Sequence, residues 1–230
     1  MEDLVIVNLD GGIGELVLNR PEQRNSLTGP LVRALQGGLE KLLQDENCRV
    51  IIIRGQNGFF CAGLDLKAFT QKPEPEWKAD FQKDWAKFHR TIFYANKPII
   101  GAIEGFAIAG GSALALACDF MVIGEKSFFH VMEAERGMLA PINILWLTLR
   151  HSYSLAQKLA LLAQRFTGQE VVDIGVADLC VSDEKVLIAS REMAKRLAGF
   201  EAGNLQKLKQ SIRSAMQFKD FDELLVSVRV

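Results

Sequence analysis

Two glycine-rich turns could place backbone amides where they would stabilise a negative charge. They are Cys61-Ala62-Gly63-Leu64-Asp65 and Gly105-Phe106-Ala107-Ile108-Ala109-Gly110-Gly111, and each follows an apolar run and precedes a helical pattern. The first N–H groups of a helix lack partners within it, and such donors stabilise a developing oxyanion or enolate. We therefore expect both turns to converge on one oxygen atom of a ligand. The alternative is two ordinary structural turns.

The composition is that of one globular chain with balanced charge. Its 230 residues are 49% hydrophobic, enough for one sizeable core with a smaller appendage. The net charge of −1 does not indicate nucleic-acid binding. The N-terminus lacks a signal-peptide pattern, and no apolar run approaches the ~20 residues of a membrane span. We expect a soluble, cytoplasmic protein with no nucleic-acid or membrane partner. Scattered cysteines predict reduced thiols and no metal site: Cys48, Cys61, Cys118 and Cys180.

Apolar periodicity predicts alternating strands and helices in the first half of the chain. Runs at 4–9 and 15–18 flank a glycine-rich turn and predict a hairpin. Continuous apolar runs at 49–54, 98–103 and 120–123 are typical of strands covered on both faces. This alternation predicts an α/β core with right-handed crossovers. The expected helices cover 27–43, 77–94, 111–118, 144–149, 154–164, 185–197 and 204–216.

A set of short motifs carries a resemblance to a known family. Over residues 4–181 the chain resembles the enoyl-CoA hydratase/isomerase (crotonase) superfamily, in the order and spacing of these motifs. They are Asn19-Arg20-Pro21-Glu22-Gln23-Arg24-Asn25-Ser26-Leu27, Phe60-Cys61-Ala62-Gly63-Leu64-Asp65-Leu66, Lys97-Pro98-Ile99-Ile100-Gly101-Ala102-Ile103-Glu104-Gly105, Ala109-Gly110-Gly111, Ala117-Cys118-Asp119, Gly168-Gln169-Glu170 and Gly175-Val176-Ala177-Asp178.

The resemblance implies a fold, an assembly and a ligand. The fold is α/β, a crotonase (ClpP-like) spiral of ββα units, with the spiral core at 1–190 and a helical trimerisation region at 191–230. The assembly is a homotrimer or a hexamer built as a dimer of trimers. Family members carry a further helix and a basic, proline-containing tail where this sequence shows Val226-Ser227-Val228-Arg229-Val230, so we expect a shortened helical region. The ligand is an acyl-CoA thioester, with coenzyme A part of the substrate and no separate cofactor.

The resemblance also assigns residues to the thioester. The backbone N–H groups of Leu64 and Gly110 bind its carbonyl oxygen, and glycine at 63 and 110 allows the main chain to approach closely. Losing one such donor typically costs about 10²–10³ in rate. The implied substrate-binding residues are Ala62, Gly63, Leu64, Asp65, Leu66 and Gly110.

The carboxylates distinguish the reactions of the family. Hydratases carry two glutamates, and the first position falls here on Ala113, which cannot transfer a proton. The second falls on Glu133, four residues before Gly137 and eight before Pro141. Burial in an apolar acyl pocket should raise the pKa of this base. The structural alternative is that Glu133 is a helix-start or surface carboxylate.

One carboxylate is enough to move a double bond. Glu133 would remove a proton from C2 and return it at C4 while the amides hold the enolate. The leading hypothesis is therefore an isomerase that converts 3-enoyl-CoA to 2-enoyl-CoA, as in the single-glutamate Δ3,Δ2-enoyl-CoA isomerases that the sequence resembles. The alternatives are a hydratase, dehydratase or decarboxylase of the same fold, and a non-catalytic acyl-CoA-binding protein.

Other residues are secondary candidates, each with a structural alternative. His130 could be an acid–base group or a packed histidine, and Glu135 is a less suitable carboxylate on spacing. Ser112 could be a nucleophile only with a histidine partner that the sequence does not indicate. Lys67 could meet the coenzyme A phosphates or lie in solvent. Possible walls of the acyl pocket, or core residues, are Phe128, Phe129, Met138 and Trp146.

Overall fold

Consecutive apolar residues in the central strands require cover on both faces of their sheet. The computed structural model describes residues 3–216 and 220–228. Its main sheet has the strand order β1-β2-β3-β4-β6-β9. The β1/β2 pair is the expected antiparallel hairpin, and every other neighbouring pair is parallel. The strands are β1 (Val5–Asp10), β2 (Ile13–Leu18), β3 (Val50–Gly55), β4 (Ile99–Ile103), β6 (Phe120–Gly124) and β9 (Leu179–Val181).

A second, smaller sheet has the order β5-β7-β8. Its strand β5 lies within the second glycine-rich segment, where Phe106–Ile108 is extended and the turn itself is confined to Ala109 before α4. The chain pairs β5 with β7 in parallel and β7 with β8 in antiparallel orientation. The strands are β5 (Phe106–Ile108), β7 (Phe128–His130) and β8 (Phe166–Thr167).

Ten α-helices are present in the described residues, with four short 3₁₀ helices between them. The α-helices are α1 (Gly29–Gln44), α2 (Leu66–Thr70), α3 (Phe81–Tyr94), α4 (Gly110–Ala117), α5 (Pro141–Arg150), α6 (Tyr153–Leu162), α7 (Gly168–Asp173), α8 (Val186–Ala198), α9 (Asn204–Ser214) and α10 (Phe221–Ser227). The 3₁₀ helices are η1 (Pro21–Gln23), η2 (Glu76–Lys78), η3 (Glu133–Arg136) and η4 (Asp183–Lys185).

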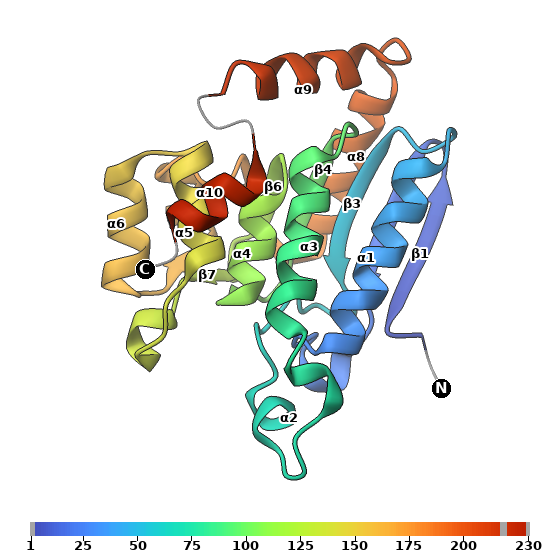
Figure 1. Ribbon diagram of the computed structural model, residues 1–230. Helices are drawn as coiled ribbons and strands as arrows, with labels where there is room; N and C mark the ends of the chain where they lie inside the picture. The colour runs from blue at the N-terminus through green and yellow to red at the C-terminus, as the bar shows by residue number, and fades with distance from the viewer. Residues whose placement is uncertain (1–2, 217–219, 229–230) are drawn as a thin grey trace.

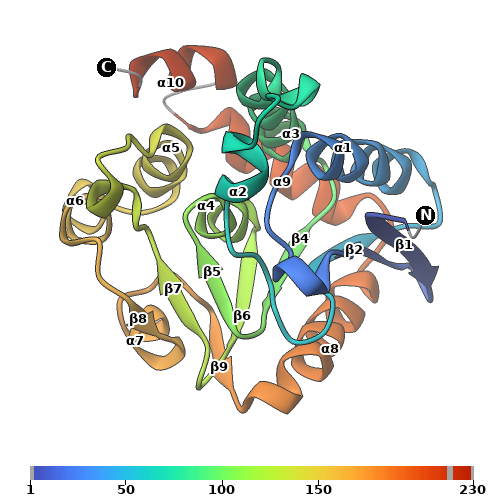
Figure 2. The same cartoon turned by 90° about the horizontal axis from the view of Figure 1, so that it is seen from below.

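Alternate residues of β3 belong to different cores. Ile51 and Ile53 pack in the larger core on the side of α1, α3 and α4, whereas Val50 and Ile52 pack in a smaller core with α8. Figure 2 shows α8 on one side of the main sheet and α1, α3 and α4 on the other. In Figure 1, α1 and α3 run side by side in front of the sheet and α9 lies across one end. Both faces of the central strands are therefore covered, as their sequences require.

One expected helix start and one expected domain boundary differ from the elements in the structure. The expected helix over 77–94 is divided into η2 and α3, and α3 begins at Phe81. Trp77 instead packs between Phe69 and Phe81, with ring centroids 5.8 Å from each. The division placed between residues 190 and 191 falls inside α8, which packs on the main sheet through Val186 and Ala194. Arg229 and Val230, at the end of the region expected to be shortened, lie outside the described residues.

Candidate active site

The first glycine-rich turn is held by a short backbone pairing with the segment before α1. The Leu27 amide donates to the Gly63 carbonyl at 2.7 Å, and the Asp65 amide donates to the Leu27 carbonyl at 2.9 Å. Leu27 and Leu64 thus form a parallel bridge in which the residues on either side of Leu64 make the bonds. Gly63 has φ +79°, a left-handed conformation that favours glycine. The Leu64 N–H itself makes no hydrogen bond in this bridge.

The neighbours of Leu64 anchor this turn. Ala62 donates its amide to the Arg24 carbonyl at 3.2 Å, whereas Leu66 is exposed. Asp65 accepts the Ala68 amide at 2.9 Å as the N-cap of α2 and pairs with Arg20 at 3.1 Å. Burial acts to raise the pKa of Asp65, but the hydrogen bonds from Ala68 and Arg20 outweigh it and hold that pKa below its usual value.

The second turn joins β5 to α4 through a strained residue. Ala109 has φ 49° and ψ −114°, a region that costs a non-glycine residue about 1–3 kcal/mol. Its amide donates to the His130 carbonyl at 2.9 Å, which ties the turn to the end of β7. Gly110 follows as the first residue of α4, where the helix dipole favours negative charge.

The two turns touch through their backbones. A Cβ built on Gly63 would lie 2.7 Å from the Ile108 oxygen and 3.3 Å from the Gly110 nitrogen. A Cβ on Gly111 would lie 2.3 Å from the Cys61 oxygen. Side chains at these positions would push the turns apart, so glycine is what lets them meet.

Two amides at this junction lack acceptors. Within residues 3–216 and 220–228, neither the Leu64 N–H nor the Gly110 N–H donates a hydrogen bond, and both residues are partly exposed. Leu27 and Trp85 flank them, because a Cβ on Gly110 would lie 2.8 Å from Leu27 Cδ1 and 3.8 Å from Trp85 Cζ2. A ligand oxygen can therefore supply the missing acceptor at the start of α4.

Glu133 begins η3 with its carboxylate turned inward, and the residue is only 8% exposed. The Asn143 side chain donates from Nδ2 to Glu133 Oε1 at 2.8 Å. In the part of the chain that the structure describes, Oε2 is buried without a hydrogen-bond partner. Burial raises the pKa of Glu133 to about 7, while the Asn143 bond acts to lower it. Such a carboxylate can accept and return a proton near neutral pH.

Asn143 is a site residue that the sequence reasoning missed. It lies at the third position of α5, is 2% exposed, and also donates from Nδ2 to the Ala109 carbonyl at 3.3 Å. Since one nitrogen contacts both acceptors, Glu133 Oε1 and the Ala109 oxygen lie within about 6 Å of each other. Asn143 therefore brings the carboxylate beside the second turn. The available signal was a lone amide side chain within an apolar helix pattern.

The residues on α4 include no acid. Ala113 is 1% exposed, so the position where hydratases are expected to carry a first glutamate offers a buried methyl group. Ser112 is fully buried, and its hydroxyl oxygen lies 2.6 Å from the Ala109 carbonyl oxygen and 3.0 Å from Asn143 Oδ1, so its single hydrogen is shared between these two acceptors. These partners do not activate a nucleophile, so the geometry gives no support to a hydrolase.

His89 and His130 lie in packed positions. His130 contacts the Ala163 carbonyl and lies 3.5 Å from Glu135, which is itself exposed. His89 accepts the Trp146 indole N–H at Nδ1 at 2.8 Å, and its complete burial lowers its pKa to about 3. His130 was expected to be either an acid–base group or a packed histidine, and its contacts are those of a packed histidine.

The suggested acyl-pocket walls do not form one group. Phe129 is fully buried, and Phe128 is partly exposed under the Arg165 guanidinium, 4.7 Å from its ring centre. Met138 is exposed, and Trp146 packs toward His89. Lys67 is exposed on α2, so its side chain lies at the surface beside the first turn.

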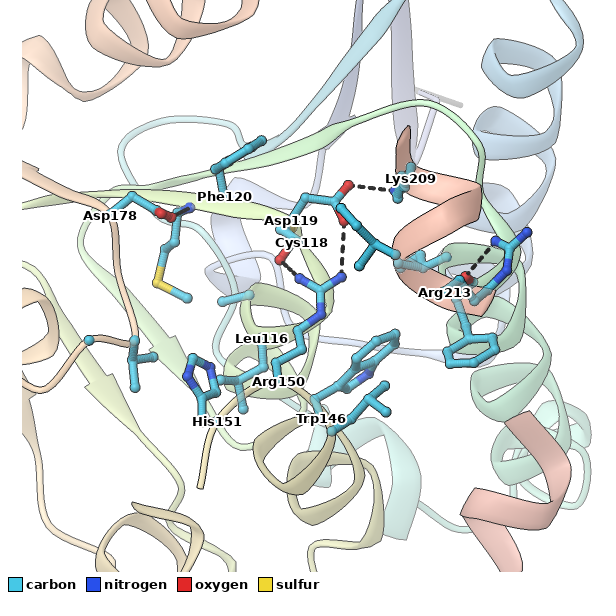
Figure 3. A pocket seen from close by; sticks show the side chains of 18 of the residues that line it. Leu116, Cys118, Asp119, Phe120, Trp146, Arg150, His151, Asp178, Lys209 and Arg213 are labelled. Carbon is cyan, nitrogen blue, oxygen red and sulfur yellow. Dashed lines mark hydrogen bonds and ion pairs between the residues drawn. The ribbon is translucent and has the colours of Figure 1, made fainter. Parts of the chain in front are cut away.

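A separate cavity of about 510 Å³ lies at the far ends of α4 and α5 (Figure 3). Its lining includes Cys118, Asp119 and Arg150 but not Leu64, Gly110 or Glu133. Arg150 and Lys209 both pair with Asp119, and Arg150 also donates to the Cys118 carbonyl. The cations are thus already bonded within the protein, and this cavity is distinct from the candidate active site.

Residues 3–216 and 220–228 show neither a metal site nor a membrane-spanning helix. No group of three or more histidine, cysteine, aspartate or glutamate side chains there could hold a metal ion. None of the helices there has both the length and the apolar character to cross a bilayer.

Comparisons with known proteins agree with one another. The sequence profile described as Enoyl-CoA hydratase/isomerase matches residues 8–226. The chain is 31% identical over 202 residues to the enoyl-CoA hydratase EchA19 of Mycobacterium tuberculosis, covering 86% of this chain and 76% of that protein. It is 30% identical over 209 residues to the carnitinyl-CoA dehydratase of Proteus mirabilis, covering 90% and 79%.

The structure agrees with a solved relative over nearly its whole length. It matches the crystal structure of enoyl-CoA hydratase from Mycobacterium tuberculosis H37Rv with a TM-score of 0.82, at 26% identity and with 98% and 96% of the two chains covered. This confirms the crotonase-type α/β fold predicted from the sequence motifs. The profile match spans most of the chain, and the chain belongs to the enoyl-CoA hydratase/isomerase family of enzymes.

Proposed function

We propose that the protein isomerises 3-enoyl-CoA thioesters to 2-enoyl-CoA thioesters, with Glu133 as the proton shuttle. The observation that carries this proposal is one buried carboxylate, Glu133, beside an α4 that has Ala113 where a second acid would be needed for hydration. Two amides that have no acceptor among the described residues, those of Leu64 and Gly110, support binding of the thioester oxygen nearby.

In the proposed reaction, Glu133 removes a proton from one carbon of the substrate and returns it to another. The Glu133 carboxylate removes a proton from C2, the C2–H electron pair enters the conjugated enolate, and the negative charge reaches the thioester oxygen. The Leu64 and Gly110 N–H groups bind that oxygen at the positive end of α4. Glu133 then returns the proton to C4 as the double bond forms between C2 and C3. Atoms and charge balance with no water consumed.

The carboxylate environment suits such a shuttle. A base that must also act as an acid works best with a pKa near the working pH. Burial raises the pKa of Glu133 to about 7, so both protonation states are accessible near neutrality. Oε2, which has no hydrogen-bond partner in the described part of the chain, supports the same role, since it can accept the proton from carbon.

Coenzyme A is part of the proposed substrate, and no further cofactor is needed. The acyl-CoA thioester would lie along Ala62, Gly63, Leu64, Asp65, Leu66 and Gly110. We propose a homotrimer or a hexamer for the assembly. Large apolar side chains that are more than half exposed on α6, α9 and α10 support self-association: Tyr153, Leu161, Leu162, Leu208, Ile212 and Val226.

Hydration or dehydration of an enoyl-CoA is the second candidate. It is favoured by the hydratase and dehydratase names of the two sequence relatives described above. It would require water to be held and a proton to be delivered with one carboxylate, because Ala113 supplies neither function. A non-catalytic acyl-CoA-binding protein would bind the thioester without turnover.

The test compares two substrates and two amide variants. Purified protein is assayed with 3-hexenoyl-CoA and crotonyl-CoA, alongside Glu133→Gln and Glu135→Gln. Glu135 is the matched control, because it lies two residues away with an exposed side chain. We expect isomerisation that collapses only in Glu133→Gln. Hydration of crotonyl-CoA without isomerisation would favour the second candidate, and binding without turnover would reject both enzymatic proposals.

A further inference from the structure

One peptide unit connects the strained turn to the proposed oxyanion donor. The Ala109 carbonyl and the Gly110 N–H belong to the same planar trans peptide, so they point in opposite directions. Whatever fixes the carbonyl also fixes the direction of the N–H. The Ala109 oxygen accepts from the Ala113 amide at 3.0 Å, the Ser112 hydroxyl at 2.6 Å and Asn143 Nδ2 at 3.3 Å.

The three bonds to the Ala109 carbonyl hold Ala109 in a strained backbone conformation. Its φ of 49° with ψ of −114° is unfavourable for alanine, and rotation of the following peptide would relieve the strain. Such rotation would turn the Gly110 N–H away from the ligand. Ala113 and Ser112 lie on α4, immediately after this peptide, whereas Asn143 reaches it from α5.

Asn143 also contacts the proposed base. Its two Nδ2 hydrogens are donated to Glu133 Oε1 at 2.8 Å and to the Ala109 carbonyl at 3.3 Å, and its Oδ1, 3.0 Å from the Ser112 hydroxyl oxygen, shares the single hydroxyl hydrogen with the Ala109 oxygen. These three partners fix the orientation of the amide, because exchanging its oxygen and nitrogen would place an oxygen against a carboxylate and a carbonyl. One buried side chain therefore holds the carboxylate and the peptide together.

We propose that Asn143 is a positioning residue that couples the orientation of Glu133 to that of the Gly110 N–H. It donates to the ionised carboxylate on one side, and on the other it stabilises the peptide that presents the donor. Polarisation of the Ala109 carbonyl also strengthens the hydrogen bond that the Gly110 N–H can donate. This inference rests on the proposed function of the site, and its experiment is designed to separate the two.

Among the residues that the structure describes, Asn143 is the side chain that hydrogen-bonds to the Glu133 carboxylate. Glu135 and His130 pair with each other, and Arg136 on η3 is exposed. On α6, which packs near η3, Lys158 lies over the Phe166 ring. Neither α4 nor the first nine residues of α5 carry a titratable side chain. A change at Asn143 should therefore be visible in the ionisation of Glu133.

The experiment uses three variants of the full chain. Asn143→Ala removes both Nδ2 bonds, whereas Ser112→Ala removes support from the Ala109 carbonyl but leaves the bond to Glu133. Thr148→Ala is the control, because its hydroxyl bonds only to α5 carbonyls within the described residues. The readouts are kcat, KM and the pH profile of 3-hexenoyl-CoA isomerisation. The Glu133 carboxyl is also titrated by ¹³C NMR, with Glu133→Gln to assign its resonance.

Each variant has a distinct expected signature. Asn143→Ala should lower kcat about 10–100-fold with KM changed less than about 3-fold, and raise the midpoint of the pH profile by about one pH unit. Ser112→Ala should lower kcat without moving the midpoint, and Thr148→Ala should change neither quantity. Asn143→Leu, of similar size, uncharged and without the Nδ2 donors, should reproduce the raised midpoint if Asn143→Ala does not fold.

Two results would overturn the coupling. One is an Asn143 variant with the wild-type midpoint in both the rate profile and the NMR titration. The other is an equal shift of the midpoint in Ser112→Ala or Thr148→Ala. A wild-type protein that isomerises nothing would instead reject the proposed function, and the NMR titration would still decide whether Asn143 sets the ionisation of Glu133.

Discussion

A side chain on Gly63 would begin 3.3 Å from the Gly110 amide nitrogen, because the two turns meet backbone to backbone. Gly63→Ala must therefore displace one turn, since its Cβ would also lie 2.7 Å from the Ile108 oxygen. Displacement of catalytic groups by about 1 Å can cost 10²-fold in rate. We expect kcat/KM for isomerisation to fall at least about 10²-fold, measured by steady-state kinetics.

Gly58→Ala is the matched control for this prediction. Gly58 has φ +73°, close to the +79° of Gly63, but a Cβ there would meet nothing within 4 Å. The left-handed backbone should lower the free energy of unfolding by about 1–2 kcal/mol in both variants, and Gly63→Ala should lose more because of its backbone contacts. Equal activity in the two variants would show that contact between the turns is irrelevant to catalysis.

The activity should depend on the ionisation of Glu133. Burial raises the pKa of this carboxyl to about 7, and the base must be ionised before it can remove a C2 proton. The isomerisation kcat/KM should therefore rise with pH and level off above a midpoint near 7. A rate profile that is already level at pH 5 would contradict the assignment of Glu133 as the base.

The free energy of unfolding should also depend on the ionisation of Glu133, but it should fall with rising pH where the activity rises. The folded state binds a proton at Glu133 more tightly than the unfolded chain, whose glutamate has the ordinary pKa of 4.5. The stabilisation is thus present below pH 4.5 and is lost as pH rises to about 7. Relative to Glu133→Gln, the wild-type free energy of unfolding should fall by about 2–3 kcal/mol across this window. Urea unfolding at pH 4.5 and 8 measures it, and parallel curves for the two proteins would contradict it.

The Arg20–Asp65 pair should stabilise the first turn more than an exposed pair would. Its side chains are only 15% and 13% exposed, and Asp65 caps α2 directly after Leu64. Arg20→Leu leaves a largely buried carboxylate without its partner, so we expect a loss of about 2–4 kcal/mol in thermal or urea unfolding.

Arg33→Leu provides the comparison, because Arg33 and Asp84 lie 2.9 Å apart with side chains 50% and 21% exposed. Exposed pairs contribute about 0–1 kcal/mol. Similar losses in Arg20→Leu and Arg33→Leu would mean that the pair beside Leu64 has no special structural role.

Much of the fold was predictable because its elements are long and strongly periodic. The expected helices over 27–43 and 185–197 lie within a residue or two of α1 and α8, and the continuous apolar runs became the central strands. The strands of the second sheet were missed because they have only two or three residues. Tertiary contacts determine how these strands pair, and a segment of two or three residues is too short to show a hydrophobic period.

The arrangement of the candidate site was predictable where it depends on the backbone. Glycines at fixed positions marked the turns that carry Leu64 and Gly110. The spacing of Glu133 to Gly137 and Pro141 marked it as the candidate carboxylate. Asn143 could not be found in the same way, because its bonds to Glu133 and Ala109 join separate elements. The placement of Trp146 against His89 likewise depends on how α5 packs on α3.

Transfer of an isotope label tests most directly whether Glu133 moves a single proton between two carbons. The enzyme is given 3-hexenoyl-CoA deuterated at C2 in ordinary water, and the product is examined by mass spectrometry and NMR. A buried carboxylate acting as the shuttle should deliver deuterium to C4 of the product, and Glu133→Gln should form no labelled product. Rapid isomerisation with only hydrogen from water at C4 would contradict the single-carboxylate mechanism.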